Sequence, residues 1–306
     1  MQGLNETLKR ELQKNGLMVR ITSIERVNEL EREIARLREQ SLLEEGFCNE
    51  NLRWLDYDYK AAMPGAQSVI VVSKRQYTTF LNFKYKGKSY RVSEPPTYVY
   101  SNLRAEVEKI LSGVLSPCGF HIKKASLPHK LLAVRTGLGM YGRNNICYID
   151  GMGSFHRIFT FYSDMPAMTD DWQEVKVMPE CGSCRACIKA CPAKCIDGGR
   201  FLIHADRCIT RYNEAEGEFP EWLKDSWHNS VVGCMRCQAA CPRNRDFMDK
   251  ADGEVDFTPE ETEAILESVP EDLLPDSLKQ KLAALDLIEY YGILGRNLAA
   301  LFAKTV

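Results

Sequence analysis

Two short runs of cysteine decide what this chain can be: CGSCRACIKACP at residues 181–192 and CMRCQAACP at residues 234–242. Within them the sulfurs recur at x2 and x3 spacings, and each run ends in Cys-Pro. Iron favours soft thiolate ligands, and x2 spacings let one tight loop place three sulfurs around one iron–sulfur cluster. The two runs therefore predict an iron–sulfur site, and the rest of the chain is interpreted outward from it.

The first run has the spacing C-x2-C-x2-C-x3-C-P of bacterial two-cluster ferredoxins, in which the fourth cysteine binds the other cluster. The second run supplies most of a complementary set, and Cys208 in DRCIT completes it. We predict one [4Fe–4S] cluster on Cys181, Cys184, Cys187 and Cys241, and another on Cys208, Cys234, Cys237 and Cys191.

Two other uses of these cysteines are disfavoured. Structural zinc takes closed sets of four from two CxxC pairs at longer separation, and it leaves the Cys-Pro endings unexplained. A disulfide framework is expected in small secreted chains, whereas this chain shows no secretory leader. Cys195 is expected to line a cluster rather than bind it. The remaining cysteines are expected to be mostly buried small apolar residues in a reducing cytoplasm: Cys48, Cys118 and Cys147.

The composition is that of an ordinary globular protein, and its charge is unevenly distributed. With 306 residues, 44% hydrophobic and 27% charged, the chain has room for one large domain or two. No apolar run approaches the roughly twenty residues of a membrane span, so we expect a cytoplasmic protein. Residues 109–149 contain no acidic residue, whereas residues 252–306 contain twelve Asp or Glu against four Lys or Arg. The basic middle suits an anionic ligand, and the acidic tail does not suit a nucleic-acid backbone.

Hydrophobic periodicity predicts alternating helices and strands before the cysteines. Helices are expected over 4–15, 24–40, 103–115 and 131–135, and strands over 17–22, 67–73, 120–125, 146–149 and 158–162. The continuous apolar run at 67–73 indicates a strand buried on both faces. Residues 46–59 are expected to be irregular and 77–93 to form a long functional loop. The pattern predicts an α/β or α+β sheet domain followed by the cluster segment.

The stretch TGLGMYGRNN, residues 136–145, places three glycines and no acid within ten residues. Glycines let a backbone approach a ligand closely, and Arg143 could pair with a phosphate there. Gly137, Gly139 and Gly142 fit GxGxxG, but no acidic residue follows about twenty positions later, as dinucleotide binding requires. From these residues alone, a plain turn is an equally good interpretation.

Taken together, several segments resemble the epoxyqueuosine reductase family, in the same order along the chain. They are MPGAQSVIVV (63–72), RTGLGMYGRN (135–144), GSF (153–155), SDMP (163–166), the double-cluster segment and GRN (295–297). The resemblance covers residues 50–245, with a weaker echo to the end. That family, and the similar reductive dehalogenases, bind base-off cobalamin on a nitroreductase-like α/β domain and supply it with electrons from two [4Fe–4S] clusters.

The resemblance implies a cobalamin site on the glycine-rich region. Its expected residues are Gly137, Gly139, Tyr141, Gly142, Arg143, Asn144, Gly153, Ser154 and Phe155. The family also carries a catalytic Asp in a D-S-A-P-like segment, but the equivalent residues 123–130 contain no carboxylate. The catalytic residue is therefore unassigned, and the weak candidates for a proton donor are His129, Tyr141 and Tyr98.

The resemblance thus predicts an oxidoreductase that passes electrons from two [4Fe–4S] clusters to a corrinoid. Epoxyqueuosine in transfer RNA is the substrate it implies, and a ferredoxin or flavodoxin is the expected electron donor. The alternatives are an electron-transfer protein without a corrinoid, and a protein that reduces or activates the corrinoid of a partner enzyme. The expected organisation is an N-terminal helical segment (1–50), a cobalamin-binding α/β domain (51–170), a ferredoxin-like double-cluster domain (171–250) and an acidic helical tail (251–306).

Overall fold

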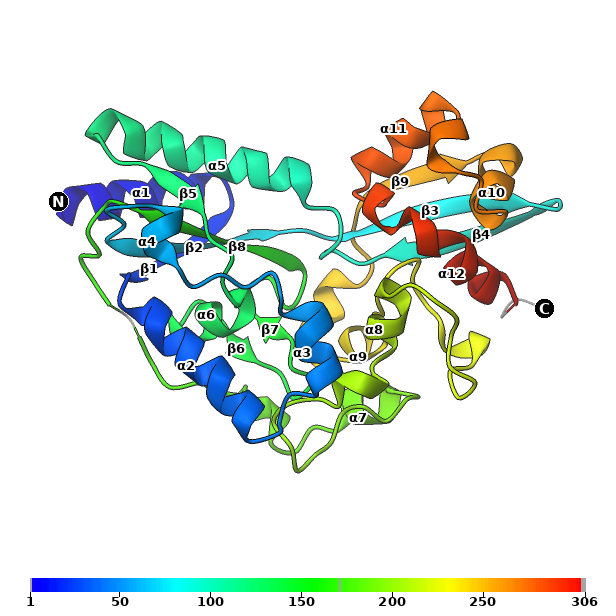
Figure 1. Cartoon of the computed structure of the whole chain (residues 1–306), viewed down its shortest axis with the longest axis horizontal. Coiled ribbons are helices and arrows are strands. Elements are labelled where there is room, and N and C mark those ends of the chain that lie inside the picture. Colours follow the sequence, from blue (N-terminus) through cyan, green and yellow to red (C-terminus); the bar gives the residue numbers. More distant parts are fainter. Residues whose placement is uncertain (1, 171, 304–306) are drawn as a thin grey trace. The chain divides into compact units, whose positions relative to one another are not determined.

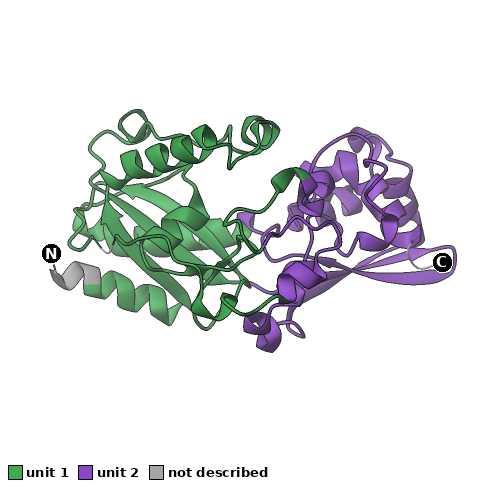
Figure 2. Ribbon diagram, turned by 90° about the horizontal axis from the view of Figure 1, so that it is seen from below, with its two compact units in different colours: residues 1–75, 102–185, 198–206 green, residues 76–101, 186–197, 207–306 purple. Residues whose placement is uncertain are grey.

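A computed structural model describes residues 2–170 and 172–303, which form two compact units built from interleaved segments of the chain (Figure 2). Unit 1 contains residues 1–75, 102–185 and 198–206, and unit 2 contains residues 76–101, 186–197 and 207–306. The division cuts across the four segments expected from the sequence, because the chain passes repeatedly from one unit to the other.

Unit 1 is organised around an antiparallel four-stranded sheet with the order β1-β2-β8-β5. Its strands are β1 (Leu17–Ser23), β2 (Ser68–Arg75), β5 (Ile122–Lys124) and β8 (His156–Ser163). The first six residues of β2 are buried, so the expectation of a strand covered on both faces is confirmed. A continuous apolar run is typical of parallel sheets, but here an antiparallel sheet has the same burial because helices cover both faces.

Alternate side chains of β2 enter two separate cores. Helices cover both faces of its sheet (Figure 1). Ile70 and Val72 pack with α1 (Gln2–Lys14) and α5 (Ser101–Leu115), whereas Val69 and Val71 pack with α2 (Arg26–Glu39) and α6 (His129–Arg135). Successive side chains of a strand point to opposite faces, so one strand can anchor both helical layers. Unit 1 is therefore a three-layer α/β/α structure, and the predicted mixed α/β fold is confirmed.

Unit 2 contains a second sheet that the sequence analysis did not predict. Residues expected to form a loop (77–93) form the hairpin of β3 (Thr78–Tyr85) and β4 (Lys88–Glu94), with Lys86 and Gly87 in left-handed conformations at the turn. The expected helical tail begins with strand β9 (Ala251–Phe257), which pairs in parallel with β3.

These strands pack with the helices of the tail. Leu81, Phe83 and Phe257 share a core with α10 (Pro259–Leu266), α11 (Asp276–Ala284) and α12 (Tyr291–Ala303). Residues 304–306 of the predicted tail lie outside the described residues.

The remaining elements are short. Residues 46–59, expected to be irregular, contain α3 (Glu45–Asn51) and the start of α4 (Tyr59–Ala62). The glycine-rich stretch forms a hairpin of β6 (Met140–Tyr141) and β7 (Cys147–Tyr148). The cysteine loops carry α7 (Ala186–Ala190), α8 (Ile209–Glu214) and α9 (Arg236–Ala239). Short 3-10 helices are Ser116–Cys118, Pro179–Cys181, Ala205–Arg207, Asp225–Trp227, Pro242–Phe247, Glu271–Leu273 and Ile288–Tyr290.

Among the described residues, none of the helices combines the length and the apolar character that a membrane crossing requires.

Candidate iron–sulfur site and glycine-rich hairpin

The four cysteines predicted to hold the second cluster all belong to unit 2. Cys191 follows α7, Cys208 precedes the first residue of α8, Cys234 lies just before α9, and Cys237 is within α9. The N-terminus of a short helix leaves backbone N–H groups free, so the positions of Cys208 and Cys234 ahead of α8 and α9 suit an anionic sulfur.

Cys195 lies between two of these predicted ligands. Its Sγ is 3.4 Å from the Sγ of Cys191, and a second hydrogen bond joins it to Cys208. The side chain is buried, with 3% of its surface exposed. Because one thiol reaches both Cys191 and Cys208, these two cysteines face a common point, as a shared cluster requires.

Backbone donors surround the two predicted ligands. The hydrogen bond from Cys195, followed by those from the N–H groups of residues 193–195, lowers the pKa of the Cys191 thiol. The hydrogen bond from Cys195 also leads in lowering the pKa of Cys208, which accepts further bonds from the backbone N–H and hydroxyl of Thr210. Both sulfurs are thus disposed to be thiolates, the form that binds metal.

A side-chain donor lies beside another of the predicted ligands. The side-chain amide of Asn229 donates to Cys234 Sγ over 3.2 Å, as expected near a cluster ligand.

Helix α12 fixes the loops that carry Cys208 and Cys234. The fully buried Asn297 side chain donates to the carbonyls of Asn213 (3.0 Å) and Val231 (2.9 Å). Arg296 donates hydrogen bonds to the backbone carbonyls of Tyr212 (2.8 Å), Ala215 (3.0 Å) and Gly217. The GRN segment of the tail is therefore part of the scaffold of the cluster loops.

The cysteines predicted for the first cluster come from both units, Cys181 and Cys184 from unit 1 and Cys187 and Cys241 from unit 2. Their assignment to one cluster rests on the spacing of the two runs. Within unit 2, α7, which carries Cys187, packs against α9, which carries Cys237 and ends just before Cys241.

The glycines of the β6–β7 hairpin are required by the hairpin itself. A Cβ atom on Gly139 would lie 2.7 Å from the carbonyl oxygen of Tyr148, and one on Gly142 would lie 2.5 Å from the Tyr148 ring. Both distances are shorter than a carbon can tolerate, so only glycine fits. These close approaches are made to the chain and do not by themselves indicate a ligand.

Arg143 ties this hairpin to the first cysteine loop. Its Nη1 donates to the carbonyl of Gly198 (2.9 Å) and its Nη2 to that of Cys181 (2.5 Å). Its Nε and the Nδ2 of Asn145 are buried donors without a hydrogen-bond partner. Two unpaired donors this close in sequence suit an acceptor-rich group, whereas the Nη atoms are not free for a phosphate.

The other predicted cofactor residues flank the same hairpin. Asn144 is buried and donates to the Tyr148 hydroxyl over 3.0 Å. Gly153 turns the chain with φ +58°, and its N–H donates to the Ile149 carbonyl over 2.9 Å. Ser154 and Phe155 are buried, and Gly137 lines a cavity at the edge of β1 with Lys9, Arg20, Thr136 and Gln173. Of the nine predicted residues, only Gly137 lines this cavity, and the role of all nine in binding remains a prediction.

The weak catalytic candidates are held in environments that disfavour proton transfer at neutral pH. His129 packs against the Trp54 ring at 5.4 Å, and burial, then the charge of Arg157, lowers its pKa to about 3. Burial raises the pKa of Tyr141, which is 7% exposed. Burial and Glu214, which accepts a hydrogen bond from the Tyr98 hydroxyl, raise the pKa of Tyr98. Their part in catalysis stays a prediction.

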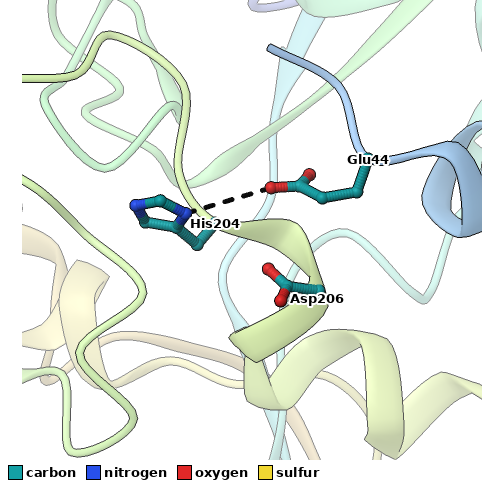
Figure 3. A group of neighbouring side chains, drawn as sticks. All are labelled: Glu44, His204 and Asp206. Atoms are coloured by element: carbon teal, nitrogen blue, oxygen red, sulfur yellow. Dashed lines mark ion pairs between the residues drawn. The ribbon is translucent and has the colours of Figure 1, made fainter. Parts of the chain in front are cut away.

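A group that the sequence analysis did not single out is formed by Glu44, His204 and Asp206 in unit 1 (Figure 3). The Glu44 carboxylate lies 4.0 Å from Nδ1 of His204, which accepts a hydrogen bond from Arg200 over 2.8 Å. Arg200 also lies 3.4 Å from Glu44. An arginine is always charged, so it already supplies the cation that these carboxylates would attract. The group is therefore explained as a structural ion-pair cluster.

A positive charge in the acid-free stretch, residues 109–149, is neutralised by a carboxylate from another part of the chain. Arg135 pairs with Glu33 of α2 at 2.5 Å, and both side chains are less than 15% exposed. A charge that looks unbalanced along the sequence is thus balanced in space.

Comparison with known proteins gives a consistent result. Residues 180–244 match the family model of the 4Fe-4S double cluster binding domain. The chain is 30% identical over 222 residues to an epoxyqueuosine reductase from Atelocyanobacterium thalassa (isolate ALOHA), covering 68% of this chain and 70% of that protein. For the enzyme of the same name from Francisella cf. novicida (strain Fx1), the identity is 29%, covering 60% of this chain and 54% of that protein.

Solved structures show the same fold. The epoxyqueuosine reductase from Streptococcus thermophilus superimposes with a TM-score of 0.69 at 20% identity, covering 98% of this chain and 81% of that one. An epoxyqueuosine reductase bound to a tRNA-Tyr epoxyqueuosine-modified stem loop matches with a TM-score of 0.66 at 19% identity, covering 96% of this chain and 81% of that one.

Proposed function

Because the chain belongs to the epoxyqueuosine reductase family, we propose that it is an iron–sulfur reductase that uses a corrinoid to reduce its substrate. The observation that carries this proposal is the double-cluster segment, whose second set of predicted ligands belongs to unit 2, where Cys191 and Cys208 both contact Cys195. Backbone N–H groups donate to the sulfurs of Cys191 and Cys208, and the Asn229 side chain donates to the sulfur of Cys234. When bound, the clusters would supply single electrons, and the corrinoid would supply the cobalt at which the substrate bond is reduced.

The residues of the chain have two tasks in this scheme. Cys191, Cys208, Cys234 and Cys237 would hold one cluster, and Asn229 and the backbone donors would stabilise its charge. In unit 1, Arg143 and Asn145 would hold the corrinoid, because their buried donors Nε and Nδ2 have no partner in the chain. The acceptor groups of a corrinoid, its amide oxygens and its phosphate, match such donors.

The substrate class proposed is epoxyqueuosine in transfer RNA, by analogy with the family name and with the relative that binds a modified stem loop. A small redox carrier such as a ferredoxin or flavodoxin would reduce the clusters. We also propose that the protein works in the cytoplasm, where thiolate ligands stay reduced.

Anaerobic reconstitution with iron, sulfide and hydroxocobalamin tests the proposal. We expect two [4Fe–4S] clusters by iron analysis and electron paramagnetic resonance (EPR), a base-off cobalamin spectrum, and reduction of an epoxyqueuosine-bearing stem loop. A protein that binds both clusters and no cobalamin would rule out the corrinoid part.

Arg143→Ala, compared with Arg143→Lys, tests the proposed corrinoid contact. We expect Arg143→Ala to weaken cobalamin retention, since it removes the unpaired Nε and the ties to the carbonyls of Gly198 and Cys181. Lysine keeps the charge but lacks the planar fork, so it should rescue little. Equal cobalamin affinity in all three proteins would remove Arg143 from the site.

One observation favours the alternative of an electron-transfer protein without a corrinoid. The space beside Gly139 and Gly142 is filled by other residues of unit 1, and both Nη atoms of Arg143 donate to carbonyls of unit 1. In that case the reconstituted protein would exchange electrons with a carrier, and its spectrum would be unchanged by added cobalamin.

A further inference from the structure

The position of Cys195 carries a further inference, which rests on the proposed iron–sulfur function. The sequence leaves this cysteine outside both predicted sets of ligands, yet its Sγ lies 3.4 Å from Cys191 Sγ and is hydrogen-bonded to Cys208. It is 3% exposed, so water does not compete for its thiol. A buried thiol held against two ligand sulfurs is placed to act on the cluster without binding iron.

We propose that Cys195 is a positioning residue whose thiol donates a hydrogen bond to the ligand sulfurs Cys191 and Cys208, and thereby raises the reduction potential of the cluster that they hold. Thiolates that bind iron can only accept hydrogen bonds, so Cys195 must keep its proton to be hydrogen-bonded to either Cys191 or Cys208. The donor can serve one acceptor at a time or be shared between them.

Backbone hydrogen bonds distinguish the two predicted ligands from the thiol that donates to them. The N–H groups of Ala193, Lys194 and Cys195 are directed at the sulfur of Cys191, and Lys194 adopts the left-handed φ of +56° that turns the loop around it. Cys208 receives the N–H and the hydroxyl of Thr210. The sulfur of Cys195 is instead hydrogen-bonded to Cys191 and Cys208. The turn after Cys191 therefore creates two anion-holding positions and places one donor between them.

The direction of the effect follows from charge. Reduction adds an electron to the cluster and increases the negative charge on its ligand sulfurs, so a donor to these sulfurs favours the reduced state. Removing the donor lowers the potential of that cluster and leaves the other unchanged.

The test is an EPR-monitored redox titration of reconstituted wild-type protein, Cys195→Ala and Cys195→Ser. At the midpoint potential of the wild-type cluster, we expect Cys195→Ala to show about a tenfold lower ratio of reduced to oxidised cluster, which is about 59 mV for a one-electron couple. Cys195→Ser keeps a donor and should remain near wild type. Iron and sulfide contents should be equal in all three proteins. Cys48→Ala, which removes another buried cysteine, should change neither potential.

Three results would overturn the inference. Equal potentials in Cys195→Ala and wild type would show that no functional hydrogen bond exists. Loss of about half the iron in Cys195→Ala would make Cys195 a ligand. A Ser variant with the same lowered potential as the Ala variant would show that packing is responsible. These failures differ from failure of the proposed function, in which the wild-type protein itself would assemble no clusters.

Discussion

The sequence predicted cluster ligands in the cysteine loops of unit 2, whereas the glycine-rich hairpin of unit 1 could equally be a plain turn, and the structure constrains the two regions for different reasons. The sulfurs of Cys191 and Cys208 are surrounded by donors and converge on a common neighbour, and no backbone requirement explains a cysteine there. Gly139 and Gly142 are required by their own hairpin, because any side chain would collide with Tyr148. A spacing of ligand atoms therefore indicates chemistry, whereas a spacing of glycines first indicates backbone geometry.

The largest effect should come from removing cluster ligands. Cys184→Ser and Cys237→Ser should each lower the iron content by about half, because the two cysteines are predicted to bind different four-iron clusters. Iron and sulfide analysis after anaerobic reconstitution measures this. Unchanged iron in either variant would remove the basis for treating the cysteine loops as a ligand site.

The second prediction tests whether the β6–β7 hairpin requires its glycines. Gly139→Ala should destabilise the protein by about 3 kcal/mol, because its Cβ would lie 2.7 Å from a backbone oxygen. Gly113→Ala is the matched control: nothing lies within 4 Å of its Cβ, and in helix α5 it should stabilise by about 0.5–1 kcal/mol. The midpoint of thermal unfolding reports both. Wild-type stability in Gly139→Ala would show that the glycine is retained for a ligand.

The third prediction concerns the scaffold of the cysteine loops. Asn297→Ala should destabilise the protein by about 2 kcal/mol, because the buried carbonyls of Asn213 and Val231 lose their donor. We also expect faster loss of iron from the reconstituted protein. Asn82→Ala removes an exposed amide that donates to Asp256, so both quantities should stay close to wild type. If the two variants had similar stability and similar rates of iron loss, α12 would not stabilise the cluster loops.

The smallest effect should be a pH dependence in the hairpin region. Burial lowers the pKa of His156, whose Nε2 lies 3.1 Å from the Cys147 carbonyl, from 6.5 to about 4. The folded state then binds fewer protons than the unfolded state between these values, so stability falls as the pH drops through that window. At pH 5 the loss should be about 1–2 kcal/mol relative to pH 7.5.

His156→Gln is the matched variant for this prediction, since its amide can donate to the same carbonyl and does not titrate. The difference in unfolding midpoint between pH 7.5 and pH 5 should be smaller in the variant than in wild type. An identical difference in both proteins would show that His156 does not control the acid sensitivity.

Hydrophobic patterns in the sequence predicted the helices and strands whose burial follows a regular period. The apolar run of β2 and the amphipathic periods of α1, α2 and α5 fix their elements through burial of one or both faces. Strands β3 and β4 were missed because their outward residues are polar, and β9 because its partner β3 lies far earlier in the chain. A parallel pairing of two distant segments leaves no local periodicity.

The candidate site followed the same rule. A set of cluster ligands could be proposed from the sequence because cluster geometry fixes the spacing of cysteines along the chain, and this assignment stays a prediction. The contacts of Cys195 with Cys208, of Arg143 with Cys181 and of Asn297 with Val231 could not, because each joins residues that only the folded chain brings together. The pairing of Arg135 with Glu33 likewise shows why an acid-free stretch does not by itself create an anion site.

The parallel pairing of β3 with β9 has a consequence for synthesis on the ribosome. The hairpin β3–β4 emerges early, but the strand that completes its sheet starts at Ala251, and the helices that cover its apolar face follow later still. Until then Leu81 and Phe83 have no permanent cover, which makes the nascent chain a client for chaperones that bind exposed apolar strands. Slow translation or early termination before residue 251 should therefore lead to aggregation of the nascent chain.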